Sequence, residues 1–202
     1  MTTWILLRAA GIGSYLMLFL AVAWGLVATT SVVTKRVSKP AANLFHAFVA
    51  STGLALLGVH MGLLLVDEFV TFSIGSLIVP MASEFRPLAV TSGVVAMYGI
   101  VTIMVTSWLR KKIGTTWWRR VHLIAVPMFT LSLAHGVFAG TDTERPFMFV
   151  MYAVTGLVVV FLTIVRALTY GYRPPRPAPP EKPVRAAAEG QPSTVSHASD
   201  TA

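Results

Sequence analysis

Long runs of apolar residues, separated by short polar segments, dominate the first 170 positions of the chain. Five runs carry no Asp, Glu, Lys or Arg and are long enough to cross a bilayer, since a transmembrane α-helix needs about 20 apolar residues. The pattern therefore predicts an all-α integral membrane protein with about five transmembrane helices. The predicted spans are Ala9–Thr34, Ala41–Val66, Leu88–Leu109, Val121–Gly140 and Pro146–Val165.

The segment Asp67–Pro87 lies between the second and third runs. Its apolar part, Phe69–Ser83, is short and is interrupted by Gly75 and Pro80. We therefore expect an interfacial or re-entrant segment here rather than a sixth span.

The first run shares one feature with secretory signal peptides, because Ala21-Val22-Ala23 resembles a cleavage site. However, the apolar stretch is longer than that of a signal peptide, and Arg8 is the only charge before it. We therefore expect a retained helix.

The composition changes near residue 170. Residues 171–202 contain seven of the 12 prolines and show no apolar periodicity, which predicts a disordered tail. We divide the chain into a membrane domain, residues 1–170, and a Pro- and Ala-rich tail, residues 171–202. The tail is too short to hold a flavin or nicotinamide domain.

Overall composition supports a membrane protein. Hydrophobic residues make up 55% of the chain and charged residues 12%, and the mean hydropathy is +0.71. A soluble domain carries about 25% charged residues. The chain has no cysteine, which excludes covalent c-type haem, cysteine-ligated iron–sulfur clusters, disulfides and thiol nucleophiles.

The net charge of +8 follows the topology. Clusters of Lys and Arg follow the first, third and fifth spans, whereas the other connections hold five acids and only Arg86 and Arg145. Positively charged loops stay in the cytoplasm. We therefore expect a multi-pass protein of the plasma (inner) membrane, with its N-terminus outside and its tail inside. The basic charge then reflects membrane topology and not nucleic-acid binding.

Four of the five histidines lie inside the apolar runs, and the fifth, His197, lies in the tail. Polar side chains at this depth are costly and are functional by default. The second and fourth spans run in the same direction, so His46 pairs with His122 in the cytoplasmic half and His60 with His135 in the outer half. The rise of 1.5 Å per residue separates the two levels by about 20 Å.

The two spans differ in how their histidines are spaced around the helix. The fourteen positions from His46 to His60 return to nearly the same face, whereas the thirteen from His122 to His135 miss it by about 140°. Pro127 lies between the latter two and can kink or rewind the helix.

Two helices that each carry a histidine near either face of the membrane form a cage for two stacked haems. Ligation by two histidines fills both axial positions of the iron and favours single-electron transfer. Haem propionates need cationic or hydrogen-bonding partners. The candidates are Arg119, Arg120, Lys35 and Arg36 for the cytoplasmic haem, and Arg86, Arg145 and Arg8 for the outer haem.

Several of these features also have purely structural interpretations. Membrane histidines can form hydrogen bonds between helices. Trp117 and Trp118 fit an interfacial aromatic belt as well as an electron stepping stone. Gly53, Gly58 and Gly62 fit small-residue helix packing as well as the close approach of a flat macrocycle. These alternatives stay open at the level of the sequence.

The histidine spacing, with thirteen residues between His46 and His60 and twelve between His122 and His135, resembles that of the ferric-reductase-like transmembrane domain family. This family includes the membrane parts of NADPH oxidases, ferric reductases and the haem subunit of bacterial methionine sulfoxide reductase systems. Further similarity covers the motifs Trp118-Arg119-Arg120-Val121-His122, His135-Gly136, Gly140-Thr141-Asp142-Thr143 and Pro80–Pro87.

The resemblance implies two b-type haems ligated by the four membrane histidines, and electron flow across the bilayer. The chain departs from the larger members in lacking FAD and NAD(P)H modules and in having one span fewer. We therefore expect a conduit between a separate donor, either a flavoprotein or a quinol, and a separate extracytoplasmic acceptor. The alternative from another class is a haem-free membrane scaffold or small-solute transporter, with histidines in helix packing or a proton relay.

Overall fold

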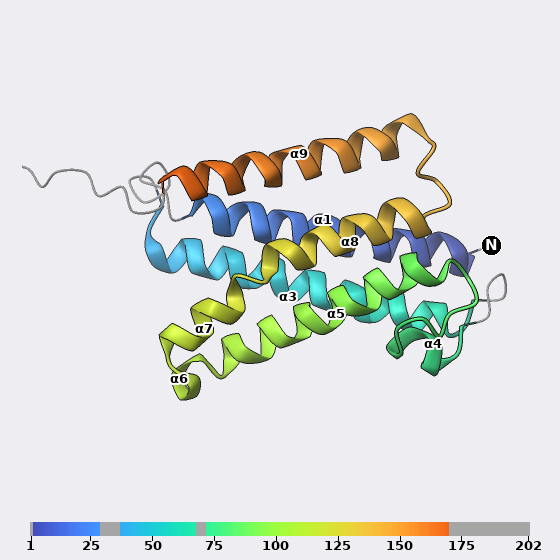
Figure 1. Cartoon of the computed structure of the whole chain (residues 1–202), viewed down its shortest axis with the longest axis horizontal. Coiled ribbons are helices and arrows are strands. Elements are labelled where there is room, and N and C mark those ends of the chain that lie inside the picture. Colours follow the sequence, from blue (N-terminus) through green and yellow to red (C-terminus); the bar gives the residue numbers. More distant parts are fainter. Residues whose placement is uncertain (1, 29–36, 68–71, 170–202) are drawn as a thin grey trace, which may run out of the picture. The chain divides into compact units, whose positions relative to one another are not determined.

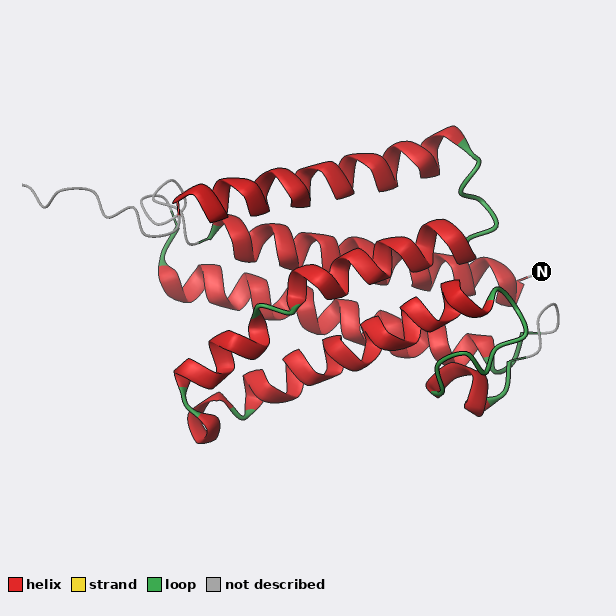
Figure 2. Ribbon diagram, in the orientation of Figure 1, coloured by secondary structure: helices red, strands yellow, loops and turns green. Residues whose placement is uncertain are grey.

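The computed structural model describes residues 2–28, 37–67 and 72–169, most of which are helical (Figure 2). Five helical segments of the described part are long and apolar enough to cross a membrane, which confirms the predicted all-α membrane architecture. They are α1 (Thr2–Val27), α3 (Lys39–Leu64), α5 (Pro87–Trp108), the consecutive helices α7 (Thr115–His122) and α8 (Ala125–Ala139), and α9 (Pro146–Thr169). The tail from residue 171, with His197, and the candidates Lys35 and Arg36 lie outside the described residues.

The first helix begins seven positions earlier than predicted, at Thr2, and therefore contains Arg8. The apolar residues that precede Arg8 continue the helical run, and a long cationic side chain near a helix end can reach a polar partner. Arg8 forms an ion pair with Asp142, in the connection between α8 and α9. Arg8, the charged residue just before the predicted start of the span, thus lies within the helix.

The connection between α3 and α5 contains one short helix, α4 (Ile74–Ile78). Ser73 and Ser76 form a reciprocal capping box at its start. With five residues α4 is far too short to span a bilayer, as predicted for this segment. Residues 68–71 of the predicted interfacial segment lie outside the described part.

The fourth membrane segment is interrupted at Leu123 and Ile124, between α7 and α8 (Figure 2). Pro127 explains the interruption, because proline has no N–H to donate to the carbonyl of Leu123 and its ring clashes with that carbonyl. His122 therefore ends one helix and His135 belongs to the next. The sequence analysis allowed for a kink or rewinding at Pro127, and the helix is interrupted three residues before this proline.

Two antiparallel helix pairs build the bundle: α1 packs along α3, and α5 packs along α8 (Figure 1). Helix α9 covers α1 and α8. The centre of this packing is Phe129, which is 1% exposed and stacks on Tyr15 with ring centroids 5.6 Å apart. The Tyr15 hydroxyl bonds to the Thr155 hydroxyl at 2.5 Å and so ties α1 to α9.

The two ends of the bundle carry different charges. The short helix α6 (Arg110–Ile113) and α7 lie at one end, and the start of α1 and α4 lie at the other (Figure 1). Arg110, Lys111, Lys112, Arg119 and Arg120 make the first end basic, and the second end holds the acids Asp67, Glu84, Asp142 and Glu144. We call these the basic end and the acidic end.

Candidate functional site

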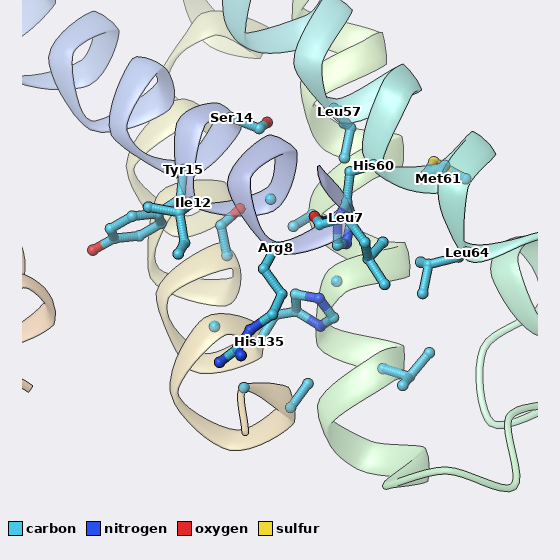
Figure 3. Close-up of a pocket in the computed structure, with 18 of the residues that line it drawn as sticks. Leu7, Arg8, Ile12, Ser14, Tyr15, Leu57, His60, Met61, Leu64 and His135 are labelled. Carbon is cyan, nitrogen blue, oxygen red and sulfur yellow. Dashed lines mark hydrogen bonds between the residues drawn. The ribbon is translucent and has the colours of Figure 1, made fainter. Parts of the chain in front are cut away.

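The four membrane histidines form two pairs at two levels of the bundle. At the level nearer the basic end, the ring centroids of His46 on α3 and His122 on α7 lie 6.0 Å apart, with planes inclined by 58°. Nearer the acidic end, His60 on α3 and His135 on α8 line a single cavity (Figure 3). The structure thus brings together the residues that the sequence pairs by depth. We call them the inner pair and the outer pair.

Each imidazole of the outer pair is held by a backbone carbonyl of a neighbouring helix. His60 Nδ1 lies 3.0 Å from the Leu7 oxygen on α1, and His135 Nδ1 lies 2.9 Å from the Ala89 oxygen on α5. A carbonyl only accepts, so in both rings Nδ1 carries the hydrogen and Nε2 keeps its lone pair. Histidines that bind metals are typically oriented by such a bond. The outer pair therefore offers two fixed, unprotonated ring nitrogens.

Glycines on the opposing helices make room for these rings. A Cβ atom on Gly93 of α5 would lie 2.6 Å from His135 Nδ1, and one on Gly11 of α1 would lie 2.9 Å from His60 Nδ1. At the inner pair, a Cβ on Gly25 would lie 3.5 Å from the His46 ring. Gly11 and Gly93 also line the cavity. Their absence of a side chain lets the outer imidazoles lie directly on the neighbouring backbone.

The glycines singled out from the sequence of the second span have other surroundings. A Cβ on Gly53 would touch the side chain of Met17, at 3.1 Å, so this position belongs to the packing of α1 on α3. Cβ atoms on Gly58 and Gly62 would meet nothing within 4 Å. The glycines beside the histidines sit on partner helices, between 21 and 49 positions away in the sequence, where no local pattern marks them.

The inner pair is held differently. Nδ1 of His46 and Nδ1 of His122 are buried without a hydrogen-bond partner among the described residues, although the Ala21 carbonyl lies near the His46 ring. The His122 ring instead lies against Trp118, with centroids 5.0 Å apart and planes inclined by 36°. A buried imidazole nitrogen without a partner is costly, and a ligand to that nitrogen would remove the cost.

The spacing of the inner rings is compatible with a shared metal. A metal bonded to one nitrogen of each ring at about 2 Å would hold the ring centroids about 6 Å apart. No group of three or more His, Cys, Asp or Glu in the described ranges could hold a bare metal ion. A metal that is already held by a macrocycle would need only two ligands from the protein, and each pair offers two histidines.

The cavity at the outer pair has a volume of about 290 Å³ and lies among α1, α3, α5 and α8. Most of its lining is apolar, with a few polar groups near the acidic end, the mixture typical of cofactor and ligand sites. Figure 3 shows His60, His135 and Arg8 on three different helices that border the cavity. The polar side chains of the lining, apart from the histidines, are Arg8, Ser14, Tyr15, Asp67, Ser132, Thr141, Asp142, Thr143 and Tyr152.

The cations predicted for the outer site lie in different places. Arg86 donates to the carbonyls of Phe138, at 2.6 Å, and Gly140, at 3.5 Å, so it caps the end of α8 and does not line the cavity. Arg145 bonds to Asp142 at 3.2 Å and is 74% exposed, also outside the cavity. Arg8 does line it, beside the Trp4 ring at 4.0 Å from the centroid. Of these three cations, Arg8 is the one that lines the cavity of the outer pair.

The cations predicted for the inner site lie on α7, the helix that His122 ends. Arg119 and Arg120 are both exposed, and the Arg120 guanidinium lies 5.1 Å from the centroid of the Trp117 ring. Both are within one helical turn of His122 in the sequence. Trp117 itself is 63% exposed, as expected for a residue of an interfacial belt.

Comparisons of the chain with known protein families, with curated proteins and with solved structures find no match.

Proposed function

We propose that the chain is a multi-pass membrane electron-transfer protein that holds two haem b groups. His46 and His122 would be the axial ligands of one, and His60 and His135 those of the other. The observation that carries the proposal is the convergence of four membrane histidines, from distant parts of the sequence, into two pairs at two depths. The resemblance to ferric-reductase-like transmembrane domains supports the same ligand set.

The residues present fit such a cofactor. At the outer pair the Nδ1–H bonds to Leu7 and Ala89 leave both Nε2 lone pairs for an iron, and the apolar cavity is suited to a macrocycle. At the inner pair the rings have the spacing expected of two axial ligands, and their Nδ1 atoms lack other partners in the described part. A bound haem would supply reversible one-electron chemistry at each level.

Two ligand pairs at different depths suit transfer across the bilayer. His46 and His60 are separated by fourteen residues of one helix, about 21 Å along its axis at 1.5 Å per residue. One pair therefore serves each half of the membrane. By the positive-inside rule we place the basic end in the cytoplasm and the acidic end outside, with the N-terminus outside.

In this scheme electrons pass from a separate donor, a flavoprotein or a quinol, through the two sites to a separate extracytoplasmic acceptor. His46, His122, His60 and His135 would hold the two haems, and each haem would supply one-electron transfer between these separate molecules.

The test is the haem content of the full chain, expressed with adequate haem supply and purified in mild detergent. We expect a red protein with two haems b per chain by the pyridine haemochrome assay, and low-spin spectra. His60→Ala and His135→Ala should each remove the outer haem and leave the inner one largely loaded. His46→Ala and His122→Ala should do the reverse.

The matched control is His197→Ala, which removes a histidine from the predicted tail and should keep both haems. A colourless wild-type protein would favour the haem-free scaffold or transporter. Unchanged haem content in all four membrane variants would show that the ligand assignment is wrong.

A further inference from the structure

The connection at the basic end presents an unusual concentration of positive charge. Helices α6 and α7 carry five cations, all of them exposed: Arg110, Lys111, Lys112, Arg119 and Arg120. The sequence contains no Asp or Glu between Glu84 and Asp142, so no acid of this hairpin offsets them. We call this element the α6–α7 hairpin. Its field favours an anionic partner, because clustered charges of one sign raise the local concentration of oppositely charged solutes.

The hairpin is also connected to the inner histidine pair. Trp118 is half-buried, and its Nε1 donates to the Ser107 hydroxyl at 3.2 Å, which fixes α7 against α5. One side of this residue meets the His122 ring, at 5.0 Å between centroids. The Arg110 guanidinium lies 4.7 Å from the centroid of the same indole. An aromatic side chain thus joins the exposed cations to the inner site.

We propose that the α6–α7 hairpin is the docking surface for a soluble, anionic electron donor. The donor would meet the cations and deliver its electron beside Trp118 to the site of His46 and His122. One electron leaves the reduced donor and is accepted at that site, so no covalent bond forms or breaks. This inference rests on the proposed function and specifies where the donor binds and what charge it carries.

Juxtamembrane cations can also bind anionic lipid headgroups. The contact of Arg110 with Trp118, and of Trp118 with His122, favours a redox partner, because it places positive charge at an indole whose ring lies against a proposed ligand. Binding of lipid headgroups would not require the contact of Trp118 with His122. The two occupants make different predictions in a reduction assay.

The experiment compares two reductants with the same redox-active ring but different charge. Haem-loaded full-length protein in phosphatidylcholine nanodiscs is mixed with reduced FMN, which carries a phosphate, or with reduced riboflavin, which does not. Haem reduction is followed by stopped-flow absorbance. At low ionic strength we expect reduction by FMN to be about ten-fold faster than by riboflavin, the lower end of electrostatic steering effects. High salt should abolish the difference.

Variants separate the role of charge from that of the indole. Lys111→Gln combined with Lys112→Gln should slow reduction by FMN and leave riboflavin unchanged, because only the first is attracted by charge. Arg145→Gln, which removes an exposed cation at the acidic end, is the matched control and should change neither rate. Trp118→Phe should slow both reductants alike, whereas Trp108→Phe, at an exposed position at the end of α5, should slow neither.

Haem content and low-spin spectra are measured for every variant, so that a folding defect is recognised. Equal rates for FMN and riboflavin at low salt would overturn the inference while the proposed function stands. A charge effect that appears only in nanodiscs containing phosphatidylglycerol would also overturn it and identify the hairpin as a lipid-binding surface. A wild-type protein without haem would instead refute the proposed function itself.

Discussion

His135 lies directly on the backbone of α5 at Gly93, where even a methyl group would come within 2.6 Å of its Nδ1. The same nitrogen bonds to the carbonyl of Ala89, one turn earlier on that helix. The position of the imidazole is therefore set by the absence of one side chain and by one carbonyl. A change at Gly93 acts on the outer site without altering a ligand.

Gly93→Ala should displace the His135 ring, because a ring in contact with backbone has little room to move. We expect loss of the outer haem, with about one haem left per chain. Gly58→Ala, on the second span, adds a methyl where nothing lies within 4 Å and should keep both haems. Equal haem content in the two variants would contradict the proposed fit of His135 against α5.

The loss of haem caused by a glycine-to-alanine substitution should be smaller where the added Cβ lies farther from the imidazole. Gly11→Ala, with a Cβ at 2.9 Å from His60, should weaken the outer site, whereas Gly25→Ala, at 3.5 Å from His46, is an ordinary contact and should be tolerated. Haem per chain, measured for Gly93→Ala, Gly11→Ala and Gly25→Ala, should rise in that order. A different order would show that the glycines do not control the ring positions.

Pro127→Ala tests the interruption between α7 and α8. The restored N–H can bond to the Leu123 carbonyl, which favours one continuous helix. In a continuous helix His122 and His135 point in directions about 140° apart. We expect the variant to lose the inner haem and to keep the outer one. The reduced-minus-oxidised absorbance spectrum checks this. Pro146→Ala is the control, since a proline in the first turn of α9 interrupts no helical bond.

The buried hydroxyl pair of Tyr15 and Thr155 should contribute to the packing of α1 against α9. Thr155→Val leaves the Tyr15 hydroxyl without this partner and should lower the free energy of unfolding by about 1 kcal/mol, as for other hydrogen bonds between membrane helices. Thr163→Val, which removes only a bond to Val159 within α9, should have a smaller effect. The measurement is thermal unfolding in detergent.

The ion pair of Arg8 and Asp142 should hold the α8–α9 connection over the cavity. A double-mutant cycle with Arg8→Met and Asp142→Asn, measured as the free energy of unfolding, should give a coupling energy of about 1 kcal/mol, within the range for residues in contact. Glu144→Gln, at the exposed neighbouring acid, should show no coupling to Arg8→Met. A coupling energy near zero for Asp142 would mean that the pair does not stabilise the connection.

The apolar runs were sufficient to predict the five membrane segments and the absence of a sixth span between the second and third of them among the described residues. The first helix begins at Thr2 and not near Ala9, because Arg8 lies within the helix and has its partner, Asp142, 134 positions away. Arg86, a candidate for a haem propionate from its place in the sequence, caps α8 through the carbonyls of Phe138 and Gly140. Residue type and depth are visible in one sequence, whereas the partner of a polar group across the bundle is not.

The histidines could be grouped because depth follows from position along a helix, and depth alone pairs them. The residues around each histidine could not be predicted in this way, because Gly11 and Gly93 lie on other helices, and the rotation of those helices depends on packing. The spacing of His122 and His135 did contain a local signal, because thirteen positions miss the same helix face and Pro127, which can kink or rewind a helix, lies between them. The identity of the stacked neighbour, Trp118, needed the structure.

Gly11 and Gly25 on α1 are fourteen residues apart, and so are His60 and His46, the histidines that they face on α3. The interval between the two glycines on α1 therefore equals the interval between the two histidines on α3. A residue added between the two glycines, without a matching one between the two histidines, would put one imidazole against a side chain instead of a gap. Length changes in these two stretches should thus be inherited together, and a family of such chains would keep both intervals or alter both.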